Sequence, residues 1–167
     1  AGAAVTAFSS AAHAERGAQG QLNMIFWQAP STLNLYLSTG TKDITAASLV
    51  LEPLANFDAK GDLVAKLAAE IPTLENGGVA QDGKSITWKL KDGVKWSDGT
   101  PLTAEDVKFT AEYCMDESGG CAQAAKFTGI SSVEVVDPLT VKINFTEARP
   151  YPYSAFVGGQ APIIQKA

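Results

Sequence analysis

Short turn sequences divide the middle of this chain, and that division constrains its fold more than any other feature. Residues 58–61 read Asp-Ala-Lys-Gly, and residues 82–83 and 92–93 both read Asp-Gly. Aspartate followed by glycine favours tight hairpin turns, because glycine adopts positive φ angles without steric cost. We therefore predict that the middle of the chain forms a series of antiparallel hairpins.

The residues between these turns alternate between apolar and polar side chains. Ile86, Trp88 and Leu90 alternate with threonine and lysine, and beyond the next Asp-Gly turn Val94 and Trp96 flank a lysine. Successive side chains of a strand point to opposite faces, so this alternation places the apolar ones on a single face. The sequence thus predicts a half-buried antiparallel sheet in which both runs take part.

Strands are also predicted towards both ends of the chain. Residues 21–27 form a largely apolar run that ends before Pro30, which predicts a strand buried on both faces. Val133 and Val135 alternate with Glu134 and Val136, and apolar and polar residues alternate in 141–145, on either side of an Asp-Pro turn. This second pattern predicts one more hairpin.

Two helices are predicted from capping residues followed by apolar positions at helical spacing. The first covers about residues 44–54, with Asp43 or Thr45 as its N-cap. The second covers about residues 104–115, where Thr103 and an aspartate three residues later form a capping-box pattern. An apolar stripe along this second helix predicts that it packs on the sheet.

The first residues have the pattern of a secretory signal. Residues 1–8 are small and apolar, and Ala12-His13-Ala14 places small residues where signal peptidase requires them. We predict that residues 1–14 are the remnant of a signal peptide cleaved after Ala14; an alanine-rich tail is the alternative. The residue directly after the cleavage position is a glutamate and not a cysteine. We therefore expect a periplasmic protein without a lipid anchor at that point.

The composition argues against several classes of function. The 167 residues carry a formal net charge of −5 and no run of lysine or arginine, so we expect no nucleic-acid partner. No apolar run reaches the roughly 18 residues needed to span a bilayer. The single histidine, His13, lies in the predicted leader, and no glycine-rich phosphate-binding motif occurs. We therefore expect no catalytic residue, no metal and no cofactor.

The two cysteines fit an oxidising compartment. Cys114 and Cys121 flank a six-residue stretch that contains two adjacent glycines, which lets the two sulfur atoms meet. We predict a disulfide between them. The alternative is two free thiols, with Cys114 buried on the face of the second helix.

One long stretch carries a family resemblance. Residues 90–109, LKDGVKWSDGTPLTAEDVKF, resemble the signature of the family 5 extracellular solute-binding proteins, the peptide, dipeptide and nickel binding group. The segments 50–54, 67–70 and 133–145 also lie where that family has similar segments. The resemblance covers roughly residues 22–160, and family members are considerably longer than this chain.

The resemblance implies a fold and a function. The expected fold class is α/β (mixed α+β), of the periplasmic binding protein-like class II. Residues 15–167 would be the amino-terminal part of lobe I with its inserted antiparallel β-hairpin subdomain, incomplete at the carboxyl end. The expected protein is a monomer without enzyme activity that captures peptides or peptide-like solutes. Two lobes would close on the ligand, and the closed form would dock on an ABC permease in the inner membrane.

The resemblance also indicates where ligand contacts would lie. It points to the segment 27–34 and to the loop 39–43, which together give seven ligand-binding residues: Trp27, Gln28, Pro30, Thr32, Asn34, Thr39 and Thr41. Trp27 could instead be a core residue. The signature has a structural explanation, in which Trp96 fills the core and Thr103 starts a helix, so we expect it not to contact the ligand.

Two other readings remain open at this point. The first is an exported enzyme whose active site lies in a carboxyl-terminal part beyond residue 167. The second is a structural or adhesive β-domain, which the hairpins alone would allow but which the helix within the signature disfavours. The class of ligand is also open, since a peptide, an oligosaccharide and a metal chelate all fit the resemblance.

Overall fold

A three-stranded antiparallel sheet is the largest β element of the protein. The computed structural model describes residues 20 and 23–166. The sheet contains β3 (Ser85–Lys89), β4 (Ile130–Asp137) and β5 (Thr140–Phe145) in the order β3-β5-β4. The hairpin predicted at the carboxyl end is confirmed, because β4 and β5 pair antiparallel across the Asp-Pro turn.

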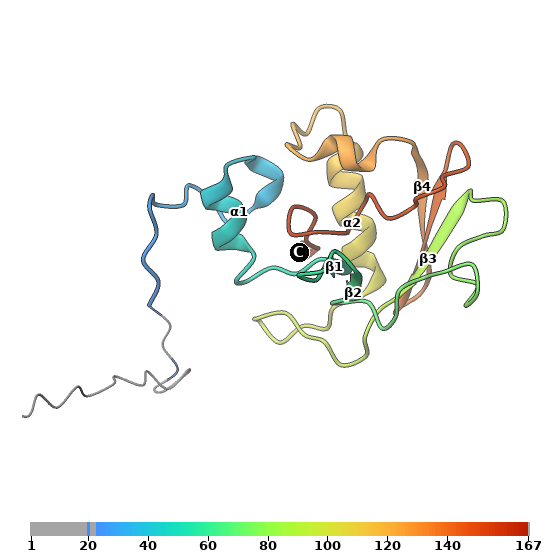
Figure 1. The fold of residues 1–167 in the computed structure, drawn as a ribbon, viewed down its shortest axis with the longest axis horizontal. Helices are drawn as coiled ribbons and strands as arrows, with labels where there is room; N and C mark the ends of the chain where they lie inside the picture. Colours follow the sequence, from blue (N-terminus) through green and yellow to red (C-terminus); the bar gives the residue numbers. More distant parts are fainter. Residues whose placement is uncertain (1–19, 21–22, 167) are drawn as a thin grey trace, which may run out of the picture.

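Helix α2 (Ala104–Met115) lies against this sheet, as Figure 1 shows. Its bounds match the predicted helix. The backbone N–H of Thr103 donates to Oδ2 of Asp106 at 2.8 Å, which satisfies one of the amide groups that a helix start leaves unpaired. Val107, Ala111 and Cys114 are buried and form the stripe that faces the sheet.

The main core lies between α2 and the sheet. In β3, Ile86 and Trp88 are fully buried and pair with Ile143 and Val141 of β5. Val107 of α2 is fully buried as well. Burying one such apolar side chain contributes about 1.5–3 kcal/mol, so this cluster is the main source of stability. The mixed α and β fold expected from the sequence is confirmed.

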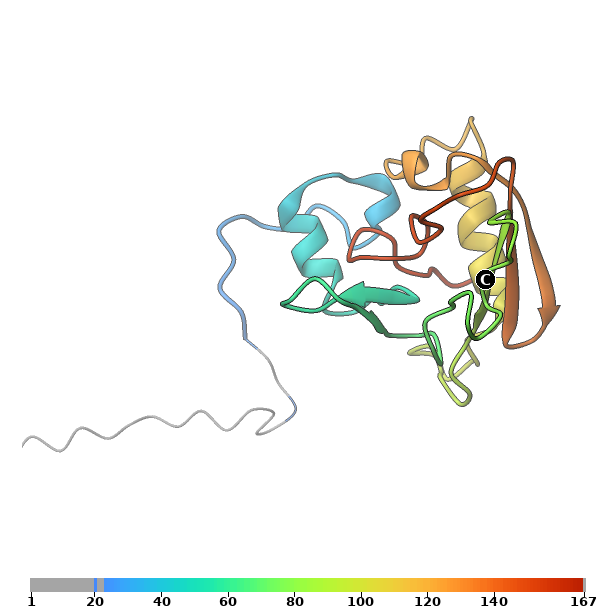
Figure 2. The same cartoon turned by 45° about the vertical axis from the view of Figure 1, so that its right-hand side comes forward.

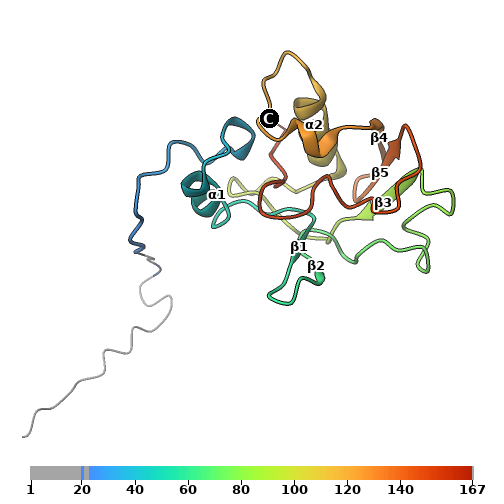
Figure 3. The same ribbon diagram turned by 45° about the horizontal axis from the view of Figure 1, so that its top comes forward.

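A separate two-stranded hairpin projects beside the sheet (Figure 3). It consists of β1 (Ala55–Phe57) and β2 (Leu63–Ala65), which pair antiparallel across the predicted turn at 58–61. Gly61 has a φ of 90°, a conformation that glycine adopts without strain. The turn at 82–83 is also present and joins Val79, which bridges to Ile86, to the start of β3.

The prediction for residues 94–96 was wrong in one respect. They do not extend the sheet but form a small hairpin with residues 100–102, held by backbone hydrogen bonds of 2.8 and 2.9 Å. On the side of β3 away from β5, Val79 forms an isolated bridge with Ile86, and Ala68 forms one with Leu90, directly after β3. Alternation predicted the strand character of these residues, but it carried no information about their partners.

The strand predicted at 21–27 is not present. Residues 21 and 22 lie outside the described residues, and residues 23–27 form no strand. Ile25 is 103% exposed and Met24 46%, so these two apolar side chains are not buried as the prediction required. A strand needs a neighbouring strand, and the described residues contain no strand that pairs with 23–27.

The first helix is shorter and begins earlier than predicted. Helix α1 spans Thr41–Ala47, with Gly40 rather than Asp43 or Thr45 at its N-cap. Pro53 disfavours a helical backbone at residue 52, so the helix could not have continued to residue 54. No helix among residues 20 and 23–166 is long and apolar enough to cross a membrane.

The carboxyl-terminal segment 151–166 runs back between α1 and α2 (Figure 2). The backbone N–H of Leu54 donates to the carbonyl of Phe156 at 2.9 Å, and Ile163 N–H donates to the carbonyl of Glu52 at 3.0 Å. These contacts tie the start of the β1–β2 hairpin to the end of the chain. The predicted signal segment 1–14 lies outside the described residues.

Candidate functional site

The predicted ligand-binding segment folds around a short 3-10 helix, η2 (Leu35–Leu37). The side-chain oxygen of Asn34 accepts a hydrogen bond from the N–H of Tyr36 at 3.0 Å, which caps this helix. The hydroxyl of Thr32 accepts from the N–H of Asn34 at 3.0 Å. Two of the seven predicted residues therefore already use side-chain oxygens to shape the turn.

Asp43 of α1 holds the two ends of this segment together. Its carboxylate accepts hydrogen bonds from the N–H of Ser31 at 2.6 Å and from the hydroxyl of Ser38 at 2.6 Å. The ammonium of Lys42 lies 3.1 Å from the same carboxylate. The hydrogen bond from Ser38, followed by that from Ser31, holds the pKa of Asp43 well below its usual range. Asp43 is buried, and its carboxylate is the charge that organises this segment.

Tyr36 anchors the same segment to the body of the protein. Its side chain is fully buried, and its hydroxyl donates to the carbonyl of Pro162. Its ring lies 6.1 Å from that of Tyr113 and 6.2 Å from that of Phe127. Burial raises the pKa of Tyr36, because the phenolate would lose its hydration.

The structure divides the seven predicted residues into two groups. One group flanks η2 and the start of α1, and the other lies on the segment that runs away from the body of the protein (Figure 1). The first group is Thr32, Asn34, Thr39 and Thr41, and the second is Trp27, Gln28 and Pro30. Trp27 is 68% exposed and stacks on Phe26 at 5.3 Å, so it is not a core residue of the described chain.

None of these seven residues lines either of two large cavities, although Leu33, between Thr32 and Asn34, lines the first of them. Each has a volume of about 640 Å³. Val50, Trp96 and Ile164 line the first, together with other apolar residues, and Arg149 and Tyr153 are among those that line the second. Within residues 20 and 23–166, no cluster of His, Cys, Asp or Glu side chains could hold a metal ion.

Residues of the signature stretch form hydrogen bonds with the carboxyl-terminal residues 165–166. Asp106 accepts at Oδ1 from the N–H of Lys166 at 2.8 Å, while its Oδ2 lies 3.4 Å from the indole nitrogen of Trp96. The amide of Gln165 donates to Asp98 at 2.8 Å and to Thr100 at 2.9 Å. The hydroxyl of Thr100, and next the amide of Gln165, lower the pKa of Asp98 to about 2.

The predicted core role of Trp96 is confirmed only in part. Trp96 is partly buried and packs against the core, with its indole nitrogen near Asp106 at the start of α2, whereas Trp88 is the fully buried tryptophan inside the core. Both tryptophans lie at apolar positions of alternating runs, so the pattern could not separate them. The long-range hydrogen bonds of the signature had no signal in the sequence.

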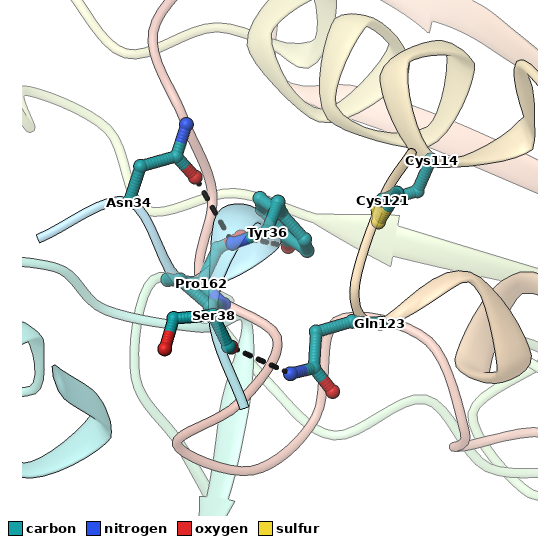
Figure 4. Close-up of a disulfide and its surroundings, with 7 residues drawn as sticks. All are labelled: Asn34, Tyr36, Ser38, Cys114, Cys121, Gln123 and Pro162. Atoms are coloured by element: carbon teal, nitrogen blue, oxygen red, sulfur yellow. Dashed lines mark hydrogen bonds between the residues drawn. A yellow bond between two sulfur atoms is a disulfide. The ribbon is translucent and has the colours of Figure 1, made fainter. Parts of the chain in front are cut away.

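The predicted disulfide is present. Cys114 lies in the last turn of α2 and is bonded to Cys121, with their Cα atoms 5.0 Å apart (Figure 4). The bond closes the loop that follows α2, directly before η3 (Ala124–Phe127).

Comparison with known proteins identifies the family. The model of the bacterial extracellular solute-binding proteins, family 5 Middle, matches residues 62–167. The chain belongs to this family. The glutathione-binding protein GsiB of Escherichia coli K12 is 30% identical over 127 residues, which are 76% of this chain and 23% of that protein. The chain thus spans about a quarter of the length of the curated relatives it matches.

Solved structures show the same fold. AgaA from A. tumefaciens R10, in complex with agropinic acid, is 27% identical with a TM-score of 0.70, over 81% of this chain and 26% of AgaA. NikZ from Campylobacter jejuni, in complex with Ni(L-His), is 26% identical with a TM-score of 0.67, over 81% of this chain and 25% of NikZ. The family expected from the signature is confirmed.

Proposed function

We propose that this chain is part of the substrate-binding component of an ABC importer. The protein would capture peptides or peptide-like solutes in the periplasm and deliver them to a permease in the inner membrane. The observation that carries this proposal is the family match over residues 62–167. A relative that binds glutathione, which is a tripeptide, supports the ligand class.

The proposed ligand contacts are the seven residues on either side of η2. Gln28, Thr39 and Thr41 expose polar side chains, and Trp27 exposes an aromatic face. Peptides present amides and carbonyls that need hydrogen-bond partners, and apolar side chains that an aromatic ring can cover. The two groups together therefore offer the chemistry that a peptide requires.

The proposed site forms only one wall of a cleft. Each hydrogen bond to a ligand is worth about 0.5–1.5 kcal/mol net, while association costs several kcal/mol of lost freedom. One wall should thus give much less than half of the affinity. In this proposal residues 15–167 belong to lobe I of a monomeric two-lobed protein without catalytic residues, and residues 1–14 are removed on export.

Titration calorimetry on a longer protein that contains this chain tests the function. Glutathione and a panel of short peptides serve as ligands, with the 167-residue chain and Trp27→Ala compared with the unchanged protein. We expect binding by the longer protein, little or none by the chain alone, and about tenfold weaker binding by Trp27→Ala, or ~1.4 kcal/mol. Tyr151→Ala is the matched control, because Tyr151 is an exposed aromatic residue outside the site.

Thermal unfolding of the same variants separates affinity from stability. Trp27 is 68% exposed, so Trp27→Ala should change the free energy of unfolding by less than about 0.5 kcal/mol. Unchanged affinity in Trp27→Ala would remove this residue from the site, and tight binding by the chain alone would overturn the two-wall argument. Mass spectrometry of the peptides afterwards would show hydrolysis if the protein were an exported enzyme.

A further inference from the structure

The two residues that directly follow the disulfide contact the proposed ligand-binding segment. Immediately after Cys121, the N–H of Ala122 donates to the carbonyl of Tyr36 at 2.8 Å. The side-chain amide of Gln123 donates to the carbonyl of Ser38 at 3.3 Å (Figure 4). These two contacts join parts of the chain that lie more than eighty residues apart in sequence.

Both acceptors are groups that a helix end leaves unpaired. Tyr36 lies in η2, and Ser38 is its C-cap. The last carbonyls of a helix have no partner within the helix and must find one elsewhere. Gln123 is a polar residue that is only 7% exposed, and burying its amide is favourable only when the amide is hydrogen-bonded. The loop and η2 therefore satisfy each other's polar groups.

We propose that the disulfide between Cys114 and Cys121 positions the segment 32–41, by holding Ala122 and Gln123 where they meet η2. Cys114 is fixed because it belongs to α2, which packs on the sheet. The intervening loop contains two adjacent glycines, which have the greatest freedom of any residue. Without the bond, the loop would be more flexible, and forming the hydrogen bonds to the carbonyls of η2 would cost more conformational entropy.

This role differs from general stabilisation of the fold. Helix α2 keeps its capping contacts and its buried stripe without the bond, so the sheet and its core should keep their structure and lose only the global stability that closing the loop supplies. The effect should concentrate on η2 and on the start of α1, whose protected amides include those of Tyr36, Leu37 and Gly40. The inference rests on the proposed function only where it treats this segment as ligand-binding.

Hydrogen exchange measured by mass spectrometry on this chain tests the proposal without any ligand. The variants are Cys114→Ala with Cys121→Ala, and Gln123→Ala, which keeps the disulfide but removes the side-chain contact. Met115→Ala is the matched control, because Met115 neighbours Cys114 and is 37% exposed. We expect exchange in peptides covering 34–41 to rise about tenfold in the double variant, as for the loss of one or two ordinary hydrogen bonds.

Gln123→Ala should produce a smaller rise in the same peptides, and Met115→Ala none. Exchange in peptides from β3 and β5 should rise less than in those covering 34–41 in the double variant, where the loss of the bond also lowers global stability, and should not change in the other two variants. Unchanged exchange in 34–41 in the double variant would overturn the proposal, and so would an equal rise in β3 and β5, because that pattern means general destabilisation. No ligand is used in this experiment. Its result can therefore contradict the role of the disulfide while the Trp27→Ala titration supports the proposed function, or support that role while the titration contradicts the function.

Discussion

The sheet with α2 and the segment 23–41 are built on different principles. In the first region, side chains that alternate along strands or recur along a helix meet in one apolar core. In the second, few apolar side chains meet, and single polar contacts do the positioning: Asp43 to Ser31 and Ser38, and Tyr36 to Pro162. Removing a single polar group should therefore disturb the second region more than the first. Removing a large apolar side chain from the core should lower the free energy of unfolding of the whole molecule.

The largest expected effect is in the core. Trp88 is fully buried in β3 and packs edge-on against Tyr153 at 6.3 Å. Trp88→Ala should lower the free energy of unfolding by about 3–5 kcal/mol, because it removes a large apolar side chain and leaves a cavity. Urea unfolding followed by circular dichroism measures this change. Leu49→Ala, at a residue that is 54% exposed, should change little, and a comparable loss there would contradict the contrast.

A smaller effect is expected where the second region meets the first. Tyr36→Phe keeps the ring among Tyr113 and Phe127 but leaves the carbonyl of Pro162 without its donor. The loss should be about 1–3 kcal/mol, the cost of one buried unsatisfied group. Urea unfolding near pH 7 measures it, with Tyr151→Phe as the control for an exposed tyrosine.

The same variant should alter the stability at alkaline pH. The pKa of Tyr36 is raised in the folded protein, so its contribution to stability is complete below its ordinary pKa of about 10 and is lost as the pH rises above that value. Tyr36→Phe should reduce the loss of stability between neutral pH and about pH 11. The pKa of Tyr153 is also raised, chiefly by burial, so part of the alkaline loss should persist. An identical alkaline loss in both proteins would contradict the burial of the Tyr36 hydroxyl.

The contrast also explains what could be predicted from the sequence. Helix α2 and the β4–β5 hairpin follow from residues within a few positions of each other, so capping and alternation were sufficient. The disulfide likewise follows from two cysteines separated by a short loop. The contact of Gln123 with Ser38 and those of Gln165 and Lys166 with the signature join residues sixty or more positions apart, and no local pattern encodes such partners. The role of Asp43 was missed although its partners lie within twelve residues, because neither capping nor alternation describes it.

The seven proposed ligand-binding residues show the same limit. The family resemblance pointed to a stretch of chain that η2 orders, and its ligand contacts stay a prediction. The resemblance could not show that Thr32 and Asn34 use their oxygens locally. Nor could it show that Asp43 and Gln123 hold the segment in place. Several of these contacts are made to backbone N–H and carbonyl groups. Every residue has such groups, so the sequence does not show which of them a side chain will contact.

The smallest expected effect concerns Asp43. The pKa of Asp43 is lowered in the folded protein, so its contribution to stability is complete above its ordinary pKa of about 4 and is lost as the pH falls below that value. Asp43→Asn keeps the size of the side chain but removes the charge that Ser38 and Lys42 contact. The variant should be less stable than the unchanged protein at neutral pH, and the difference should shrink in acid.

Urea unfolding at neutral pH and at about pH 3 measures this difference, with Glu117→Gln as the control for an exposed carboxyl group. Other carboxyl groups with a lowered pKa, such as those of Asp98 and Asp116, will still lose stability in acid in both proteins. Only the difference between the two proteins reports on Asp43. A difference that stays constant across this range would mean that the amide fails to replace the carboxylate for reasons of shape alone, and that charge does not organise the segment. A difference in the free energy of unfolding that disappears in acid would instead mean that the charge of the buried Asp43 carboxylate holds Ser31, Ser38 and Lys42 together.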